Sequence, residues 1–173
     1  MILADVDILR EIKEGNIEIS PYTPEFMNPN SYNLRLHDIL LVYADAVLDA
    51  KKKNRTSGVR IPEEGILLQP GVLYLGSTIE STRTSGNIVP MIEGRSSIAR
   101  LGICIHLTAG FGDVGFEGNW TLELSVVQPV RIYPGLQVCQ IFYTRTETPP
   151  ERSYQGRYQC AKGVQESKLY EDY

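Results

Sequence analysis

Short runs of apolar or alternating residues dominate the chain, and turn residues separate them. The pairs Pro70-Gly71 and Pro134-Gly135, for example, each stand between two such runs and are typical of turns. Many short strands at this spacing predict a mainly β fold, either a barrel or a two-sheet roll. The predicted strands cover residues 32–36, 39–43, 66–69, 72–76, 88–92, 103–108, 120–127 and 138–143.

One helix is predicted near the start of the chain, over residues 5–14. Ile8, Leu9 and Ile12 recur there at helical spacing and would form one apolar face. Asp5 stands where a capping residue is needed. Few later stretches have a convincing helical period, and short strands and loops are expected there instead.

The composition fits one globular domain of 173 residues, with 42% hydrophobic and 22% charged residues. A chain of this length can bury a core that needs neither disulfides nor metals. Residues 1–145 are expected to form the β domain. Residues 146–173, rich in proline, tyrosine and charge, are expected to form a tail of the same domain. Residues 49–60 are polar and basic and predict an exposed loop.

Charge and cysteine content exclude several classes of protein. The formal net charge of −4 disfavours binding to nucleic acid through a general basic surface, although a phosphate-bearing ligand remains possible where cations gather locally. Cys104, Cys139 and Cys160 form no CxxC pair and are expected to be free thiols. No signal peptide is visible, and no apolar run approaches the ~20 residues of a membrane span. We expect a cytoplasmic protein that binds neither nucleic acid nor membrane.

Residues 93–124 hold most of the candidate chemistry, beginning with a basic turn. Arg95 and Arg100 flank Ser96 and Ser97 within six residues. Two guanidinium groups, two hydroxyls and the N–H groups of a turn suit the oxygens of a polyphosphate. A solvated turn is the simpler interpretation of this pattern taken alone, so both interpretations stay open.

A loop rich in glycine follows the predicted strand 103–108. Four glycines between residues 110 and 118 indicate a tight loop with much exposed backbone. The strand–helix–strand setting of a dinucleotide site is missing around this loop, so the glycines do not indicate such a site. Asp113 could meet a sugar hydroxyl or a water, and Phe116 could pack on a sugar ring. Turn chemistry and core packing explain these two residues equally well. His106, on the preceding strand, is most simply a structural histidine with satisfied hydrogen bonds.

The predicted strand 120–127 carries a carboxylate in its middle. Leu122 and Leu124 share one face of the strand, whereas Thr121 and Glu123 share the other. A carboxylate among bulky neighbours is costly unless it is partnered, which makes Glu123 a candidate general base. An edge strand with Glu123 in water is the alternative.

Together these segments resemble the dCTP deaminase family. Zinc-dependent base deaminases carry HxE and PCxxC signatures, and neither is present in this sequence. The resemblance implies hydrolytic, zinc-independent deamination of dCTP to dUTP and ammonia. It rests on EGRSSIARLG at 93–102 and HLTAGFGDVGFEGNWTLEL at 106–124, and it extends to residues 28–38, 68–76, 133–143 and 154–163.

The resemblance also implies a fold, an assembly and ligands. The fold would be a dUTPase-like distorted β-barrel or jelly roll with a short N-terminal helix. The protein would be a homotrimer with active sites between neighbouring chains. Mg²⁺ would be bound through the triphosphate of the nucleotide, with no zinc and no metal held by the protein itself. Some family members are inhibited by dTTP through a shift of the loop 108–113, so dTTP is an expected inhibitor.

Residue by residue, the resemblance assigns a reaction centre. Glu123 matches the catalytic glutamate, which activates water for attack on cytosine C4. The carbonyl of Ala109 would help to hold that water. Ser96 and Arg100 match residues that line the centre, where Arg100 could stabilise either the anionic base or the developing tetrahedral charge.

The other matching positions are expected to bind the nucleotide. Asp113 would bind the sugar 3′-hydroxyl, and Phe116 would pack on the deoxyribose and disfavour a ribose. In the tail, Tyr154, Arg157 and Tyr158 match a segment that closes over the nucleotide, so residues 146–173 are expected to close over the active site. Ala161 replaces a glutamine expected to touch phosphate, and Asn33 replaces an aspartate at a position taken as structural. The expected substrate contacts are Arg95, Ser96, Ser97, Ile98, Ala99, Arg100, Thr108, Asp113, Phe116, Thr121, Leu122, Glu123, Gln140, Tyr154, Arg157 and Tyr158.

Several functions remain open, and a deaminase that releases dUTP is favoured. A bifunctional enzyme that also hydrolyses the triphosphate and yields dUMP is the alternative, because the aspartate matching Asp113 orients water in dUTPases. Gly110 and Gln140 also resemble the bifunctional members. A dUTPase without deamination would not need Glu123. A trimer that binds deoxynucleotides without turnover is the remaining possibility.

Overall fold

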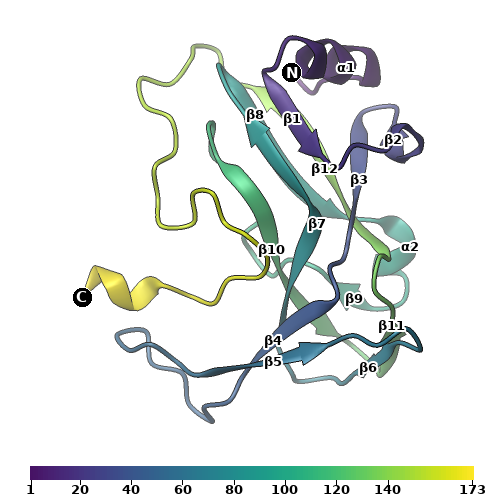
Figure 1. The fold of residues 1–173 in the computed structure, drawn as a ribbon, viewed down its shortest axis with the longest axis vertical. Coiled ribbons are helices and arrows are strands. Elements are labelled where there is room, and N and C mark those ends of the chain that lie inside the picture. Colours follow the sequence, from purple (N-terminus) through teal and green to yellow (C-terminus); the bar gives the residue numbers. More distant parts are fainter.

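The computed structural model describes residues 1–173 and consists mainly of β-strands (Figure 1). Its helices are α1 (Asp5–Lys13) and α2 (Ser96–Ala99), with 3₁₀ turns η1 (Pro24–Phe26) and η2 (Leu169–Asp172). Its strands are β1 (Ile17–Ser20), β2 (Met27–Asn28), β3 (Ser31–Arg35), β4 (Ile39–Tyr43), β5 (Thr56–Arg60), β6 (Ile66–Leu68), β7 (Tyr74–Thr84), β8 (Ile88–Gly94), β9 (Ile103–Cys104), β10 (Glu117–Val126), β11 (Val130–Ile132) and β12 (Gln137–Arg145).

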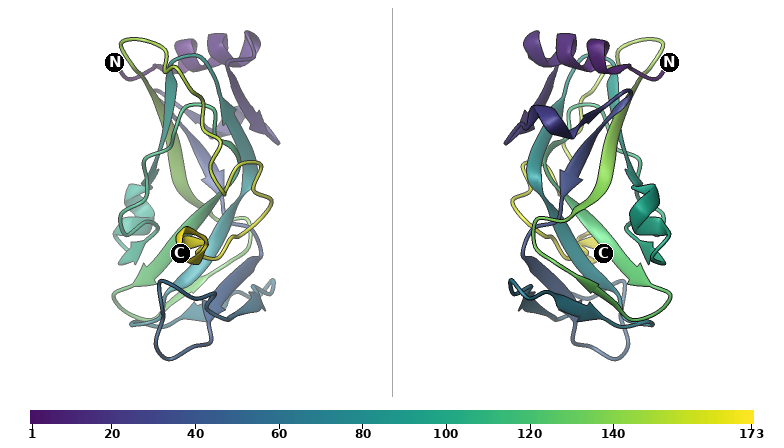
Figure 2. Two further views of the ribbon diagram at one scale, coloured as in Figure 1. Left: turned by 90° about the vertical axis from the view of Figure 1, so that its left-hand side faces the viewer. Right: turned by 90° about the vertical axis from the view of Figure 1, so that its right-hand side faces the viewer.

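The strands form two larger sheets and one small one. The first sheet has the order β5-β4-β7-β10-β9, with β1 also paired to β7. The second has the order β2-β3-β12-β8, and β11 pairs with β6. From the side, α1 lies across one end of the strands, while α2 and the C-terminal tail lie on opposite sides of the molecule (Figure 2). The predicted mainly β fold with one short N-terminal helix is confirmed.

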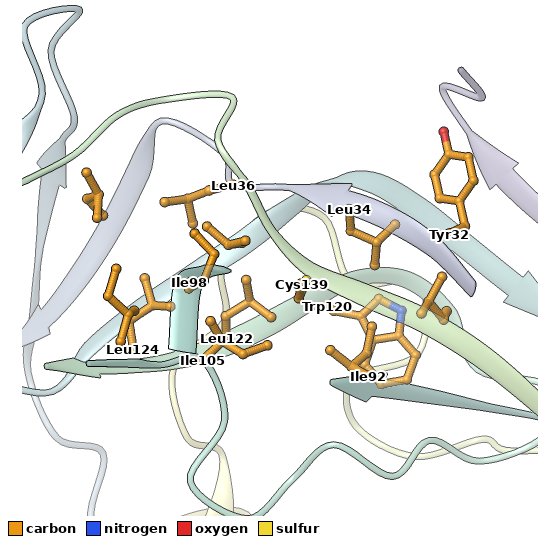
Figure 3. Close-up of a cluster of buried hydrophobic side chains, with 14 of the residues drawn as sticks. Tyr32, Leu34, Leu36, Ile92, Ile98, Ile105, Trp120, Leu122, Leu124 and Cys139 are labelled. Carbon is orange, nitrogen blue, oxygen red and sulfur yellow. The ribbon is translucent and has the colours of Figure 1, made fainter. Parts of the chain in front are cut away.

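The core lies between the two larger sheets (Figure 3). Leu34 of β3, Ile92 of β8 and Leu122 of β10 all meet there, each at most 1% exposed. Fully burying an aliphatic side chain of this size contributes about 1.5–3 kcal/mol. Along β10 buried and half-buried residues alternate, as predicted, so the face with Thr121 and Glu123 points away from the core.

The N-terminal helix differs from its prediction in its cap and its apolar face. Ala4 is the N-cap, and its N–H donates to the Asp7 carboxylate, so Asp5 is not the cap. Ile8 is fully buried but Leu9 is 45% exposed. The helix instead turns Glu11 toward the sheet, because that carboxylate has partners in the protein.

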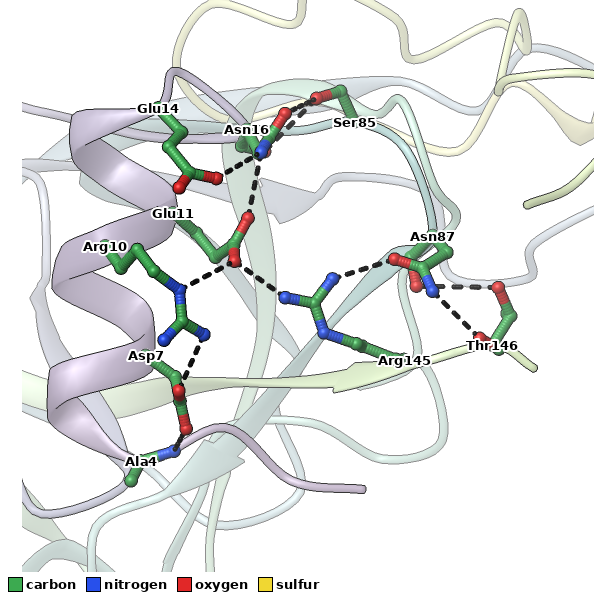
Figure 4. Close-up of polar contacts among 10 residues, drawn as sticks. All are labelled: Ala4, Asp7, Arg10, Glu11, Glu14, Asn16, Ser85, Asn87, Arg145 and Thr146. Carbon is green, nitrogen blue, oxygen red and sulfur yellow. Dashed lines mark hydrogen bonds and ion pairs between the residues drawn. The ribbon is translucent and has the colours of Figure 1, made fainter. Parts of the chain in front are cut away.

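Glu11 connects helix α1 to Arg145, the last residue of β12 in the second sheet (Figure 4). Its carboxylate accepts hydrogen bonds from Arg145 at 2.7 Å and from Asn16 at 2.9 Å. Burial raises the pKa of the Glu11 carboxyl, but the bonds from Asn16 and Arg145 outweigh it, and the pKa lies below its usual value. The buried face of the helix thus contains the partnered carboxylate of Glu11, whereas Leu9, predicted for that face, is exposed.

Several strand boundaries were wrong. The predicted strand 103–108 leaves the sheet after Cys104, and Leu107 is 58% exposed. The strand predicted at 72–76 is the start of the longer β7. Four strands were missed: β1, β2, β5 and β11. β5 lies within the predicted loop 49–60, because an edge strand can be held by backbone hydrogen bonds to β4 without an apolar pattern.

The remaining structural predictions concern the cysteines and the tail. All three cysteines are free, and burial raises the pKa of the Cys139 thiol. The tail after β12 contains no strand, although Ala161 forms an isolated parallel bridge with Gly118. No helix of the structure is long and apolar enough to cross a membrane.

Candidate functional site

A cavity of ≈ 450 Å³ lies between the outward face of β10 and the C-terminal tail. The start of β7 and the half-buried face of β10 form one wall. The glycine-rich loop and the tail complete the enclosure. The cavity is lined by Tyr43, Leu73, Leu75, Ala109, Phe111, Gly112, Asp113, Phe116, Asn119, Trp120, Thr121, Glu123, Tyr154, Tyr158, Ala161, Gln165, Glu166 and Ser167.

Glu123 lies on β10 of the first sheet and lines this cavity. β10 pairs with β7 at Glu123 but with β9 only at Ser125 and Val126, so β10 is an edge strand at this residue. The predicted alternative is therefore right about the strand and wrong about the side chain, because the Glu123 carboxylate is partnered rather than left in water. The Glu123 side chain is 26% exposed, and its Oε2 lies 3.0 Å from Nδ1 of His106. A partnered, half-buried carboxylate in a cavity is suited to accept a proton from a bound water.

His106 has one satisfied nitrogen rather than two. Its side chain is 9% exposed, and Nδ1 contacts Glu123 while the buried Nε2 has no hydrogen-bond partner. A neutral imidazole that donates from Nδ1–H to the carboxylate leaves Nε2 as an acceptor. His106 lines a second cavity of ≈ 340 Å³, which Ala99 and Thr108 also line. His106 therefore fixes one oxygen of Glu123 from outside the first cavity.

The glycine-rich loop is tight because its backbone packs against the sheet. The Gly110 carbonyl accepts from the Ile92 N–H at 2.8 Å, and the Gly112 N–H donates to the Pro90 carbonyl at 3.0 Å. A Cβ on Gly112 would lie 2.4 Å from a ring carbon of Trp120, so no larger residue fits there without movement. The loop thereby places Ala109 and Asp113 on the cavity.

Aromatic rings form the part of the cavity next to Asp113. The ring of Phe116 lies 5.0 Å from that of Trp120 and 5.9 Å from that of Tyr154, centroid to centroid. Such a cluster offers an apolar surface of the size of a sugar ring. Phe116 packs against the core, as one interpretation of the sequence predicted, and it also lines the cavity, so its contact with a sugar ring stays a prediction.

The tail lies beside β10 and closes the other side of the cavity. The Gln165 N–H donates to Oγ1 of Thr121 at 3.0 Å, and the Gly163 N–H donates to Oδ1 of Asn119 at 3.0 Å. Tyr158 lies in the cavity wall. Arg157 does not, because its guanidinium binds the Asp172 carboxylate and the Lys168 carbonyl within the tail.

The basic turn around α2 lies outside this cavity. Ser96, Ser97 and Arg100 are exposed, and Arg100 forms no ion pair within the chain. Arg95 is the N-cap of α2 and donates to the Gln137 carbonyl at 3.0 Å. One chain therefore does not bring its α2 residues together with Glu123.

Three further predicted contacts face away from the cavity. The side chains of Ile98 and Leu122 belong to the core, which leaves only their backbone for a ligand. Gln140 lies in the second sheet, where its Oε1 accepts from the Ser31 hydroxyl at 2.9 Å. No group of three or more His, Cys, Asp or Glu side chains comes together in the structure.

Sequence reasoning missed a group of lining residues contributed by β4 and the end of the tail. Tyr43 lies on a strand with no chemical signature, and Gln165, Glu166 and Ser167 follow the last segment that carries the resemblance. Asn119 and Trp120 lie inside the matching signature and could have been selected from it. Only the fold shows that the tail end returns to β4.

Comparisons with known proteins agree on one family. The family model described as dCTP deaminase-like matches residues 2–146. The chain is 55% identical over 173 residues to "dCTP deaminase, dUMP-forming" from Leptospira biflexa, covering 100% of this chain and 98% of the relative. It is 56% identical to the protein of the same name from Cytophaga hutchinsonii, covering 100% of this chain and 99% of that relative.

One solved structure shares the fold. The 2′-deoxycytidine 5′-triphosphate deaminase from Agrobacterium tumefaciens superimposes with a TM-score of 0.66 at 20% sequence identity. The match covers 84% of this chain, which spans only 48% of that longer chain. This likeness supports the arrangement of strands described above.

Proposed function

The chain belongs to the dCTP deaminase-like family, and on this premise we propose that it converts dCTP to dUMP, releasing ammonia and pyrophosphate. The observation that carries the proposal is the name shared by relatives that are 55% and 56% identical over the whole chain, each dUMP-forming. The residues alone favour a reaction that ends at dUTP. The names of the relatives favour the alternative that continues to dUMP.

Deamination would take place at Glu123. This carboxylate would take a proton from a water positioned by the Ala109 carbonyl as that water attacks cytosine C4. Glu123 would pass that proton to N3 of the ring, which gives a tetrahedral intermediate with a hydroxyl and an amino group on C4. The hydroxyl proton would then pass through Glu123 to the amino group, so that the C4–N bond breaks, ammonia departs and the C4 carbonyl of uracil forms. The contact with His106 supports this role, because it fixes one carboxylate oxygen and leaves the other for the water.

The α2 residues would complete the site from a neighbouring chain. Ser96 and Arg100 are exposed, and the helix α2 lies on the opposite side of the molecule from the tail that encloses the cavity (Figures 1 and 2). In a homotrimer, the α2 turn of one chain would face the Glu123 cavity of the next. Arg95 and Arg100 would then supply cations for the charged parts of the reaction. Arg100→Ala and Glu123→Gln chains mixed and refolded together should recover part of the activity that each lacks alone.

Hydrolysis of the triphosphate would use Asp113. Its carboxylate lines both the nucleotide cavity and an adjoining one of ≈ 260 Å³. Asp113 would orient the water that attacks the phosphate. Mg²⁺ would accompany the triphosphate and neutralise part of its charge. The wall offers only the carboxylates of Asp113, Glu123 and Glu166, which suits an ion whose other ligands are phosphate and water.

Product analysis by ion-exchange chromatography tests the proposal. Purified protein with dCTP and Mg²⁺ should yield dUMP and pyrophosphate, whereas Asp113→Asn should stop at dUTP and still release ammonia. Accumulation of dUTP by the wild-type protein would contradict the second step and would show a deaminase that releases dUTP. Unchanged dCTP and unchanged dUTP in parallel tubes would support a protein that binds deoxynucleotides without turnover.

Inhibition by dTTP belongs to the same proposal. The loop 108–113 carries Ala109 and Asp113, so a second conformation of this loop would remove both from the cavity. Added dTTP should lower the rate at a fixed dCTP concentration. An unchanged rate across the titration would exclude the regulation.

A further inference from the structure

The basic hairpin between β4 and β5 lies beside the end of the tail. Residues 44–55 join the two strands and include three consecutive lysines, Lys51, Lys52 and Lys53. In Figure 1 the C-terminal segment, drawn in yellow, runs next to this hairpin. The proposed reaction assigns no role to these cations.

Glu166 of the tail connects the two segments. Its Oε1 lies 3.1 Å from Nζ of Lys53, and its Oε2 accepts from the Thr56 hydroxyl at 2.9 Å. The hydrogen bond from Lys53 is the main cause that lowers the pKa of the Glu166 carboxyl, and the Glu166 carboxylate raises the pKa of Lys53. Both oxygens of Glu166 are therefore held by the hairpin.

Two further contacts join the tail to β4 and to the hairpin. The Ser167 N–H donates to the Tyr43 hydroxyl at 3.2 Å, and Nζ of Lys51 lies 4.8 Å from the centre of the Tyr173 ring. The next amide, that of Lys168, donates to the Tyr158 hydroxyl at 3.0 Å. Tyr158, Glu166 and Ser167 line the cavity, so the same short segment joins the hairpin to the cavity wall.

The other cations of the hairpin are directed elsewhere. Lys52 pairs with Asp49 at 3.3 Å, and Arg55 pairs with Asp45 at 2.8 Å, both within the hairpin. Lys53 is thus the hairpin cation that forms an ion pair with the tail. This difference between adjacent lysines provides a matched control.

We propose that the β4–β5 hairpin and the tail form an electrostatic clasp, centred on Lys53 and Glu166, that holds the tail over the cavity. The contacts of the clasp lie within one chain and involve only protein groups. An ion pair between a 64% exposed lysine and a 23% exposed glutamate is weak and is screened by salt. The tail can therefore open for the exchange of ligands, and its closure depends on ionic strength.

Hydrogen exchange in the nucleotide-free protein tests the clasp without any enzymatic turnover. The variants are Lys53→Glu, Glu166→Lys, the double charge swap and the control Lys52→Glu. Each single reversal should raise the exchange of the amides of residues 163–168 by about two- to fivefold, the factor expected for an exposed ion pair. The double swap should restore slow exchange, and Lys52→Glu should not change it. Added salt should move the wild-type protein toward the single variants.

Two results would overturn the clasp: wild-type exchange in both single variants, or a double swap whose exchange is as fast as that of the single variants. The importance of the clasp for catalysis rests on the proposed function, because it takes the cavity as the nucleotide site. In that setting the single reversals should raise KM for dCTP more than they change kcat. A protein with intact exchange effects and no activity on dCTP would contradict the proposed function but leave the clasp standing.

Discussion

The cavity has two walls that are held in different ways. The sheet wall, formed by β7, β10 and the glycine-rich loop, is fixed by ladder hydrogen bonds and by the buried face of β10. The tail wall, residues 154–167, is fixed by single hydrogen bonds and one exposed ion pair. The sheet wall carries Glu123, which His106 contacts from outside the cavity, whereas the tail wall carries tyrosines and polar groups. Rigid elements hold reacting groups well, and weakly held segments open easily.

The largest expected effect is on the sheet wall. Leu122→Ala would leave a cavity directly behind Glu123, because Leu122 is fully buried on the opposite face of β10. We expect the free energy of unfolding to fall by about 2–5 kcal/mol, as measured by denaturant titration. Leu169→Ala is the matched control, since Leu169 is in the tail and 45% exposed. Equal losses in the two variants would contradict the distinction between the walls.

The next effect is on catalysis within the sheet wall. His106→Ala should lower kcat for deamination by about 10- to 100-fold, the loss expected when a hydrogen bond to a charged group worth about 1.5–3 kcal/mol is removed. KM should change less, because His106 contacts Glu123 rather than the outer opening. His106→Asn keeps a donor near the position of Nδ1 and should recover part of kcat. The same kcat in Asn and Ala variants would speak against a positioning role.

A smaller effect is expected in the tail wall. Tyr158→Phe removes the hydroxyl that accepts from the Lys168 N–H at 3.0 Å. A single hydrogen bond of this kind contributes about 0.5–1.5 kcal/mol, so KM for dCTP should rise about two- to tenfold in steady-state kinetics. Tyr173→Phe alters an exposed ring at the end of the chain and should leave KM unchanged. A drop in kcat alone for Tyr158→Phe would place that hydroxyl in the chemistry instead.

The smallest effect is a response of the tail to acid. The pKa of Glu166 is held below its usual 4.5, so its contribution to closure is full above that pH and is lost as the pH falls through the lowered value. In NMR spectra recorded below pH 4.5, amide signals of residues 163–168 should move toward coil positions before those of β10 do. Glu166→Gln should remove this early step. Simultaneous loss of both sets of signals would mean that the tail is not a separate unit.

The sheet wall was largely predictable from the sequence, because local patterns determine it. Alternation along residues 120–127 predicted which face of β10 is buried and placed Thr121 and Glu123 together. The density of glycine predicted the tight loop, whose backbone approaches Pro90 and Ile92 closely. The partner of Glu123 was not predictable in this way, because His106 is 17 residues away and meets it only after the chain leaves β9.

The tail wall was largely unpredictable, because it depends on long-range contacts. Glu166 and Thr56 are separated by 110 positions, and no periodic pattern marks either of them. The sequence predicts a simple exposed loop at residues 49–60, yet these residues contain β5 and the lysine that pairs with the tail. The separation of α2 from Glu123 was also not predictable, because both fall within the one signature segment, residues 93–124.

The most direct test of the account is the activity of Glu123→Gln on two substrates. With dCTP and Mg²⁺, release of ammonia should fall by about 10²–10⁴-fold, because the general base is lost while the shape of the sheet wall is kept. With dUTP, the same variant should still form dUMP at a rate near that of the wild-type protein. Continued release of ammonia from dCTP by Glu123→Gln would contradict the assignment of the sheet wall as the site of deamination.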